Sequence, residues 1–149
     1  MSLEQDLYKE IILENYKATK NKRRLENPTS EAEGNNPSCG DDLTLYMQVN
    51  GDTVEDVSYE GMGCSICCAS ANLLCEALRG AGVEEAKDII RRFRGMLVDG
   101  SDPDFQGRLE DLEAMSGVKD YPVRIKCALL AWSTAAQIVG LGGIDNESS

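Results

Sequence analysis

Residues 43–64 read LTLYMQVNGDTVEDVSYEGMGC, and this stretch decides the fold. Apolar and polar side chains alternate over residues 43–49, which is the period of a strand with one buried face. Asn50-Gly51 follows, and this dipeptide is typical of a tight hairpin turn. A second strand is predicted over residues 54–59. The stretch therefore predicts an antiparallel β-hairpin that leads into Cys64.

Helices are predicted on both sides of this hairpin. Gly61 and Gly63 are expected to break the second strand, and a helix is predicted from Cys64 to Arg79, where Gly80 stops it. Periodic apolar residues and flanking breakers predict four further helices. Three of them cover residues 3–16, 84–98 and 123–139, the last of which ends before Gly140. The fourth is short: it follows Asp102-Pro103, runs to Met115 and is ended by Gly117.

The remaining segments are predicted to be irregular. Residues 26–38 are rich in turn formers and are expected to form a loop that delivers Cys39. The polar residues 141–149 are expected to form a mobile tail. We therefore predict one α+β domain over residues 1–149, in which helices cover a small antiparallel sheet.

Composition excludes several classes of function. The net charge is −11, from 26 acidic and 15 basic residues, which argues against a nucleic-acid partner. No stretch approaches the roughly 20 apolar residues that span a bilayer, so no membrane association is expected. The N-terminus has neither a basic nor an apolar signal region, and a cytoplasmic location is expected.

The chain has six cysteines and no histidine, so any soft-metal site must be built from thiolates and carboxylates. Cys39 precedes Gly40-Asp41 at the start of the hairpin, Cys64 follows its glycines, and Cys127 lies near the start of the last predicted helix. The other three cysteines fall inside the helix after Cys64, where a small buried hydrophobe is the ordinary interpretation. These are Cys67, Cys68 and Cys75.

Two interpretations of the spaced cysteines stand side by side on composition and spacing alone. Widely separated cysteines are more often buried hydrophobes than ligands, and the intervals here match no zinc-finger pattern. Alternatively, the three thiolates and the Asp41 carboxylate meet at one point and form a tetrahedral Zn²⁺ site. The excess negative charge of such a site would need a nearby cation, for which Arg124 and Lys126 are the local candidates.

Three motifs in order resemble the iron–sulfur cluster assembly proteins of the IscU/NifU-N-like superfamily. They are Asn36-Pro-Ser-Cys-Gly-Asp41, Gly61-Met-Gly-Cys-Ser-Ile66 with Ala69-Ser-Ala71, and Pro122-Val-Arg-Ile-Lys-Cys127-Ala-Leu-Leu-Ala-Trp132. The likeness covers nearly the whole chain and looks strongest to the SufU branch. Lys126 stands where the scaffold branch usually has histidine, and the longer interval before Cys127, near residues 96–115, looks like the SufU insertion.

The resemblance implies a zinc-dependent sulfurtransferase that acts with a cysteine desulfurase rather than alone. It implies that Cys39, Asp41, Cys64 and Cys127 hold Zn²⁺, that Cys39 accepts sulfur while Asp41 tunes its release, and that Arg124 supports the site. The implied partners are a PLP-dependent, SufS-like desulfurase and a downstream SufBCD-like assembly complex. Two alternatives stay open: a scaffold that builds a [2Fe–2S] cluster on the same cysteines, and a zinc ion that only staples the fold.

Overall fold

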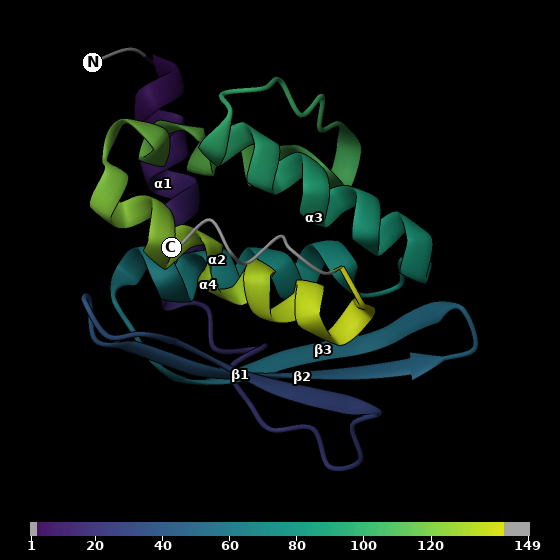
Figure 1. The fold of residues 1–149 in the computed structure, drawn as a ribbon. Coiled ribbons are helices and arrows are strands. Elements are labelled where there is room, and N and C mark those ends of the chain that lie inside the picture. Colours follow the sequence, from purple (N-terminus) through teal and green to yellow (C-terminus); the bar gives the residue numbers. More distant parts are fainter. Residues whose placement is uncertain (1–2, 142–149) are drawn as a thin grey trace.

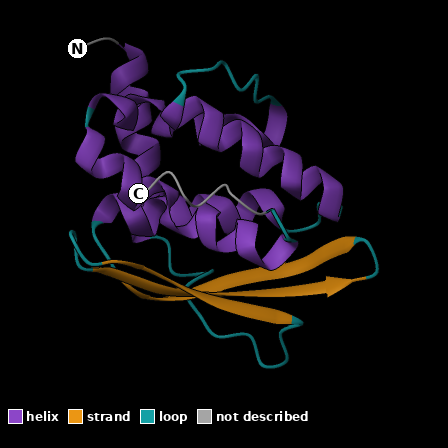
Figure 2. Cartoon of the chain, viewed as in Figure 1, coloured by secondary structure: helices purple, strands orange, loops and turns teal. Residues whose placement is uncertain are grey.

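The computed structural model describes residues 3–141, so the tail predicted at 141–149 lies, apart from Leu141, outside the described residues. A three-stranded antiparallel sheet in the order β1-β2-β3 forms one layer, and the helices gather on one of its faces (Figures 1 and 2). This arrangement confirms the predicted α+β fold with a small antiparallel sheet. No helix within residues 3–141 combines the length and the apolar character needed to cross a membrane.

The predicted hairpin is present and longer than expected. It comprises β2 (Asp41–Asn50) and β3 (Thr53–Met62), which pair from Asp42↔Met62 to Asn50↔Thr53. Gly51, with φ +63°, makes the tight turn. The expectation that Gly61 breaks the second strand is wrong, because this glycine pairs with Leu43 at φ +131°. A Cβ there would overlap the Asp42 carbonyl oxygen, so glycine permits a close approach inside the strand.

The predicted loop over residues 26–38 is also partly wrong, because Ser30–Asn36 forms strand β1. Its sequence, SEAEGNN, carries no apolar alternation. The strand exists through its backbone pairing with β2, from Ser30↔Met47 to Asn36↔Asp41. Gly34 of β1 lies directly beneath α4 (Pro122–Val139), where a Cβ would overlap Oγ1 of Thr134.

The helices follow the predicted order. They are α1 (Leu3–Lys17), α2 (Ser65–Leu78), α3 (Val83–Val98), the tighter η1 (Gly107–Asp120) and α4. η1 continues past Gly117, where the sequence predicted an end, since the buried Val118 side chain keeps this segment on the core until Tyr121. Gly140 closes α4 in the left-handed conformation.

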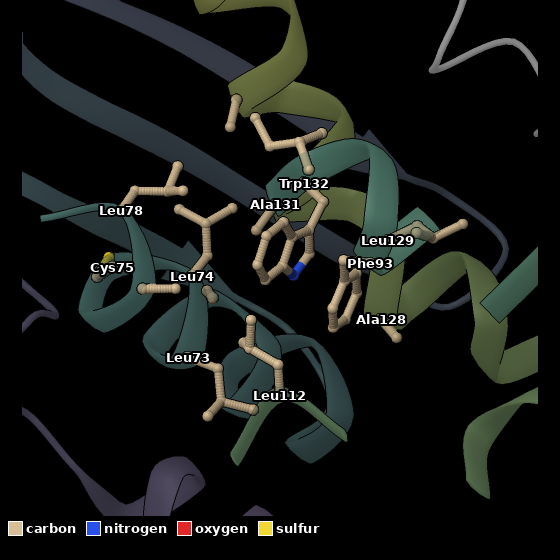
Figure 3. Packing of buried hydrophobic residues seen from close by; sticks show 14 of the residues in the cluster. Leu73, Leu74, Cys75, Leu78, Phe93, Leu112, Ala128, Leu129, Ala131 and Trp132 are labelled. Atoms are coloured by element: carbon tan, nitrogen blue, oxygen red, sulfur yellow. The ribbon is translucent and has the colours of Figure 1, made fainter. Parts of the chain in front are cut away.

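The core centres on Trp132 of α4, which stacks on Phe93 of α3 with ring centroids 4.0 Å apart (Figure 3). The indole N–H of Trp132 donates to Oγ of Ser70 at 2.9 Å, and that hydroxyl donates to the Ala128 carbonyl at 2.6 Å. Leu74 of α2 packs beside the indole ring (Figure 3). This core therefore fixes α2 relative to α4, the two helices that begin near Cys64 and Cys127.

A polar network attaches the segment after α1 to α2 and β3. Asn21, 1% exposed, donates to Asn72 Oδ1 at 2.9 Å and to Glu76 Oε2 at 2.8 Å. Arg79 donates to Asn21 Oδ1 and, through Nε, to Asp56 Oδ1 at 2.9 Å. The network positions the far end of α2, away from Cys64.

Candidate metal centre

Cys39 lies in the tight turn that joins β1 to β2. Its backbone N–H donates to the Asn36 carbonyl at 3.2 Å, and Gly40 follows with φ +73°, a conformation that favours glycine. The hydroxyl of Ser38 donates to Oδ1 of Asn36 at 2.9 Å. The thiol of Cys39 is therefore carried by a short turn and is only partly buried.

Asp41 is the first residue of β2, and its side chain is fully buried. Oδ1 accepts a 2.9 Å hydrogen bond from the backbone N–H of Cys64, and Oδ2 accepts a longer one, 3.4 Å, from Nδ2 of Asn36. Among the ion pairs of the described part of the chain, none includes Asp41. A buried carboxylate without a cation is costly, so this position suits a bound metal ion.

Cys127 lies in the second turn of α4, and its side chain is fully buried. The ligand atoms of Cys39, Asp41 and Cys127 all lie within 4.8 Å of one another. Burial raises the pKa of the Cys127 thiol, and its contacts with Asp41, Cys39 and Cys64 raise it further. A metal ion would reverse this tendency, because coordination requires the thiolate and releases the proton.

Cys64 is the N-cap of α2, and its side chain makes no capping hydrogen bond. Its sulfur does not belong to the group of three ligand atoms within 4.8 Å, although its thiol contacts that of Cys127. The structure thus brings three of the four predicted ligands together and places the fourth at their side. Three sulfurs and one carboxylate oxygen are a donor set that fits Zn²⁺.

Arg124, on the first turn of α4, is exposed, and its guanidinium faces the sulfurs of Cys127 and Cys64. The hydrogen bond with the Cys127 thiol and the negative charge of Cys64 raise the pKa of Arg124. Arg124 therefore lies beside the thiols, where a positive charge offsets part of the negative charge of the site. Lys126, the other cation that the sequence suggested, is exposed on the same helix.

Asn36 is a site residue to which the sequence assigned no role. Its side chain is 7% exposed, and Nδ2 lies 3.4 Å from Oδ2 of Asp41 and 3.9 Å from Sγ of Cys127. It thereby bridges two candidate ligands that are far apart in sequence. Its place in the first motif was the only available signal, because burial of a polar side chain has no local sequence pattern.

Cys67 and Cys68, predicted to be core residues, are buried in the first turns of α2, with 1% and 7% exposure. Burial raises the pKa of the Cys67 thiol, and the negative charges of Asp41, Cys68, Cys64 and Cys39 add to this effect. Cys67 is therefore both a core residue and a neighbour of the candidate metal centre.

Comparison with known proteins identifies relatives of the chain. The family model described as the NifU-like N terminal domain matches residues 7–128. The zinc-dependent sulfurtransferase SufU of Bacillus subtilis is 42% identical over 126 residues, which cover 85% of this chain and 84% of that protein. The iron–sulfur cluster assembly scaffold protein IscU of Thermotoga maritima is 41% identical over 128 residues, covering 86% of this chain and 89% of that protein.

Solved structures share the fold. The crystal structure of FiSufU from Fervidobacterium islandicum, described as a candidate iron–sulfur cluster assembly scaffold of the SUF system, matches with a TM-score of 0.78 and 37% identity, covering 84% of this chain and 90% of that chain. The N-terminal part of a NifU-like protein from Brucella abortus matches with a TM-score of 0.82, covering 99% of this chain and 100% of that chain. Its identity of 24% supports the fold alone.

Proposed function

This chain belongs to the NifU-like N-terminal domain family, and we propose that it is a zinc-dependent sulfur carrier for iron–sulfur cluster assembly. It accepts sulfur from the persulfide of a PLP-dependent, SufS-like cysteine desulfurase and passes it to a SufBCD-like assembly complex. The observation that carries this proposal is the convergence of Cys39, Asp41 and Cys127 within 4.8 Å, at a buried carboxylate without a cation. The similarity to a relative named as a zinc-dependent sulfurtransferase supports it.

In this proposal Cys39, Asp41, Cys64 and Cys127 hold the metal ion. Bound Zn²⁺ would keep their thiols deprotonated and protect them from oxidation. The protein contributes the positions of the ligands. Cys127 lies on α4 and Cys64 precedes α2 as its N-cap, and the Trp132 core fixes these two helices relative to each other. Cys39 is carried by a turn, so its thiol is the one that can move at the least cost.

The sulfur transfer itself is a thiolate exchange. The Cys39 thiolate attacks the outer sulfur of the desulfurase persulfide, and a new S–S bond forms on Cys39. The S–S bond of the desulfurase breaks at the same time, and its cysteine leaves as the thiolate. No net oxidation occurs, because one S–S bond replaces another. Arg124, exposed beside the site, stabilises the negative charge that accumulates there.

The test is cysteine turnover by a desulfurase with and without the zinc-loaded protein. We expect stimulation by the zinc-loaded chain and none by the Cys39→Ser variant or by metal-free protein. Unchanged turnover with the zinc-loaded wild type would refute the carrier role and favour a zinc ion that only stabilises the fold.

A second candidate function is a scaffold for a [2Fe–2S] cluster. The observation in its favour is the sulfur-rich donor set, since cysteine ligation suits iron–sulfur clusters as well as zinc. Relatives named as scaffolds, such as that of Thermotoga maritima, also support it. Purified protein distinguishes the two functions: a colourless chain with one zinc ion favours the carrier, whereas a brown chain with visible absorbance and bound iron favours the scaffold.

A further inference from the structure

We propose that Cys64 and Cys67 form a redox-active dithiol pair, which a hydroperoxide converts into an intramolecular disulfide at the N-terminus of α2. The two residues frame a Cys-x-x-Cys sequence, Cys64-Ser-Ile-Cys67. Cys64 is the N-cap of the helix and Cys67 its third residue. Neither the carrier function nor the scaffold function assigns a role to Cys67.

The helix places the two side chains within reach of each other. Residues three apart on a helix face one another, with Cβ atoms roughly 5–6 Å apart. Cys64 and Cys67 also occupy the two positions of a capping box, the N-cap and the third residue of the helix. In that motif the side chain of each residue reaches the backbone of the other. Cys64 lies outside the helix, with ψ at 170°, and no capping hydrogen bond holds its side chain. A rotation of the Cys64 side chain away from the Cys127 thiol would bring the two sulfurs together.

The contacts of Gly63 show that Cys67 points toward the segment that carries Cys64. A Cβ built on Gly63 would lie 3.0 Å from Sγ of Cys67 and 3.0 Å from Oδ1 of Asp41. The sulfur of Cys67 therefore lies against the backbone next to Cys64, on the side of the candidate metal centre. The Cys68 thiol also lies against this segment, but it is engaged in a hydrogen bond that it donates to the Gly63 carbonyl at 3.7 Å.

Burial sets the order of the reaction. Cys64 is partly exposed, whereas Cys67 is 1% exposed and shielded from solvent, so a dissolved hydroperoxide meets Cys64 more readily. The Cys64 thiol therefore reacts with the hydroperoxide first and becomes a sulfenic acid, and one water molecule is released when hydrogen peroxide is the oxidant. The Cys67 sulfur then attacks the Cys64 sulfur, the S–S bond forms, and a second water leaves. Two thiols lose two electrons, and the O–O bond of the peroxide takes them up.

One consequence rests on the proposed function, whereas the disulfide itself does not. If Cys64 is a zinc ligand, its conversion to a disulfide removes one of the four donors. The metal is then held by Cys39, Asp41 and Cys127 alone. Oxidation of the pair would therefore release zinc, and reduction by a thiol would restore the site.

The test treats metal-free and zinc-loaded protein with hydrogen peroxide. The oxidised protein is unfolded in denaturant, free thiols are blocked with light N-ethylmaleimide, and sulfenic acids are trapped with dimedone. Disulfides are then reduced, and the released thiols are labelled with the heavy reagent. Cleavage after Glu60 and Glu76 gives the peptide 61–76, which contains Cys64 and Cys67 but neither Cys39 nor Cys127. We expect the heavy label on Cys64 and Cys67 and the light label on Cys68 and Cys75, with zinc release in parallel.

Two variants form the matched control. Cys67→Ala should reduce the heavy label on Cys64 to background, whereas Cys68→Ala, the same change on the adjacent residue, should leave it unchanged. Cys67→Ser repeats the test if the alanine variant fails to fold, as judged by circular dichroism. Heavy label on Cys64 together with Cys68 or Cys127, or its persistence on Cys64 in Cys67→Ala, would overturn the proposal.

The failure of the proposed function gives a different result. A wild-type chain that binds no zinc but still forms the Cys64–Cys67 disulfide would refute the metal centre and leave the dithiol pair intact. Conversely, zinc binding without this disulfide would refute the pair alone.

Discussion

The backbone N–H of Cys64 donates a 2.9 Å hydrogen bond to Oδ1 of Asp41. This bond joins the first residue of β2 to the N-cap of α2. It orients the buried carboxylate before any metal ion is bound, and it holds two candidate ligands from different motifs together. Removal of the Asp41 carboxylate should therefore change how readily Cys39 is released from the metal, in addition to changing the charge of the site.

We expect the Asp41→Ala variant to retain zinc but to lose stimulation of a desulfurase. Three sulfur donors remain to hold the metal, whereas the harder oxygen donor that eases release of Cys39 is gone. Zinc content and desulfurase turnover are measured on the same preparation. Asp42→Ala, a change of the exposed neighbour, serves as the control and should behave like wild type. Wild-type stimulation by Asp41→Ala would show that the carboxylate has no part in opening the site.

We expect the Cys127→Ala variant to lose zinc, because its buried thiol is one of the three ligand atoms within 4.8 Å. Loss of the ion should also lower the unfolding temperature of the purified protein. Metal analysis decides the first point and calorimetry the second. Cys75→Ala is the matched control, since it removes an equally buried thiol from α2 without touching the site. Full zinc occupancy in Cys127→Ala would contradict the ligand set.

We expect the transferred sulfur on Cys39, which lies in a short turn, whereas Cys127 lies within α4 and the backbone of Cys64 is held at the start of α2 by its bond to Asp41. The protein is incubated with a desulfurase and cysteine and then cleaved at glutamates, which places Cys39 and Cys127 on separate peptides. Mass spectrometry should find the mass of one added sulfur atom on the Cys39 peptide. Sulfur on Cys127, with a Cys39→Ser variant that still accepts it, would refute the carrier chemistry.

We expect Ser70→Ala to destabilise the fold by about 1–3 kcal/mol, because the buried indole N–H of Trp132 loses its acceptor. Urea unfolding followed by fluorescence of this single tryptophan measures the change in the free energy of unfolding. Ser133→Ala, on the residue next to Trp132, should alter stability by less than about 0.5 kcal/mol. Equal effects of the two substitutions would show that the Ser70 hydroxyl does not stabilise the core.

We expect the stabilising contribution of Asp56 to disappear in acid. Burial raises the pKa of this carboxyl, but hydrogen bonds from Arg79, Arg23 and the Val57 N–H outweigh burial and lower it overall. A lowered pKa stabilises the fold above the unfolded value of about 3.9, and this stabilisation is lost as the pH falls through the folded pKa. The difference in unfolding free energy between wild type and Asp56→Asn should therefore be constant near neutrality and shrink below about pH 4. A difference that stays constant into strong acid would contradict this ion pair.

Local patterns in the sequence determined most of the elements. Alternation over residues 43–49 and Asn50-Gly51 predicted the hairpin, and apolar periodicity predicted α1, α2, α3 and α4. These signals are local, because the spacing of apolar side chains along a strand or helix follows from the period of that element and from which of its faces is buried. The three cysteine motifs, likewise, predicted a family that the comparison confirms.

Only the tertiary structure decided where these elements meet. β1 has no apolar alternation and exists because its backbone pairs with β2, and Gly61 continues its strand because Leu43 lies opposite it. Asn36 and Cys127 come within 3.9 Å across 91 positions of sequence. Such contacts depend on partners that are far away in sequence, so the local spacing of apolar residues cannot predict them. The sequence by itself determined which residues could bind a metal. The packing of α4 over β1 decided that the ligand atoms of Cys39, Asp41 and Cys127 lie within 4.8 Å of one another.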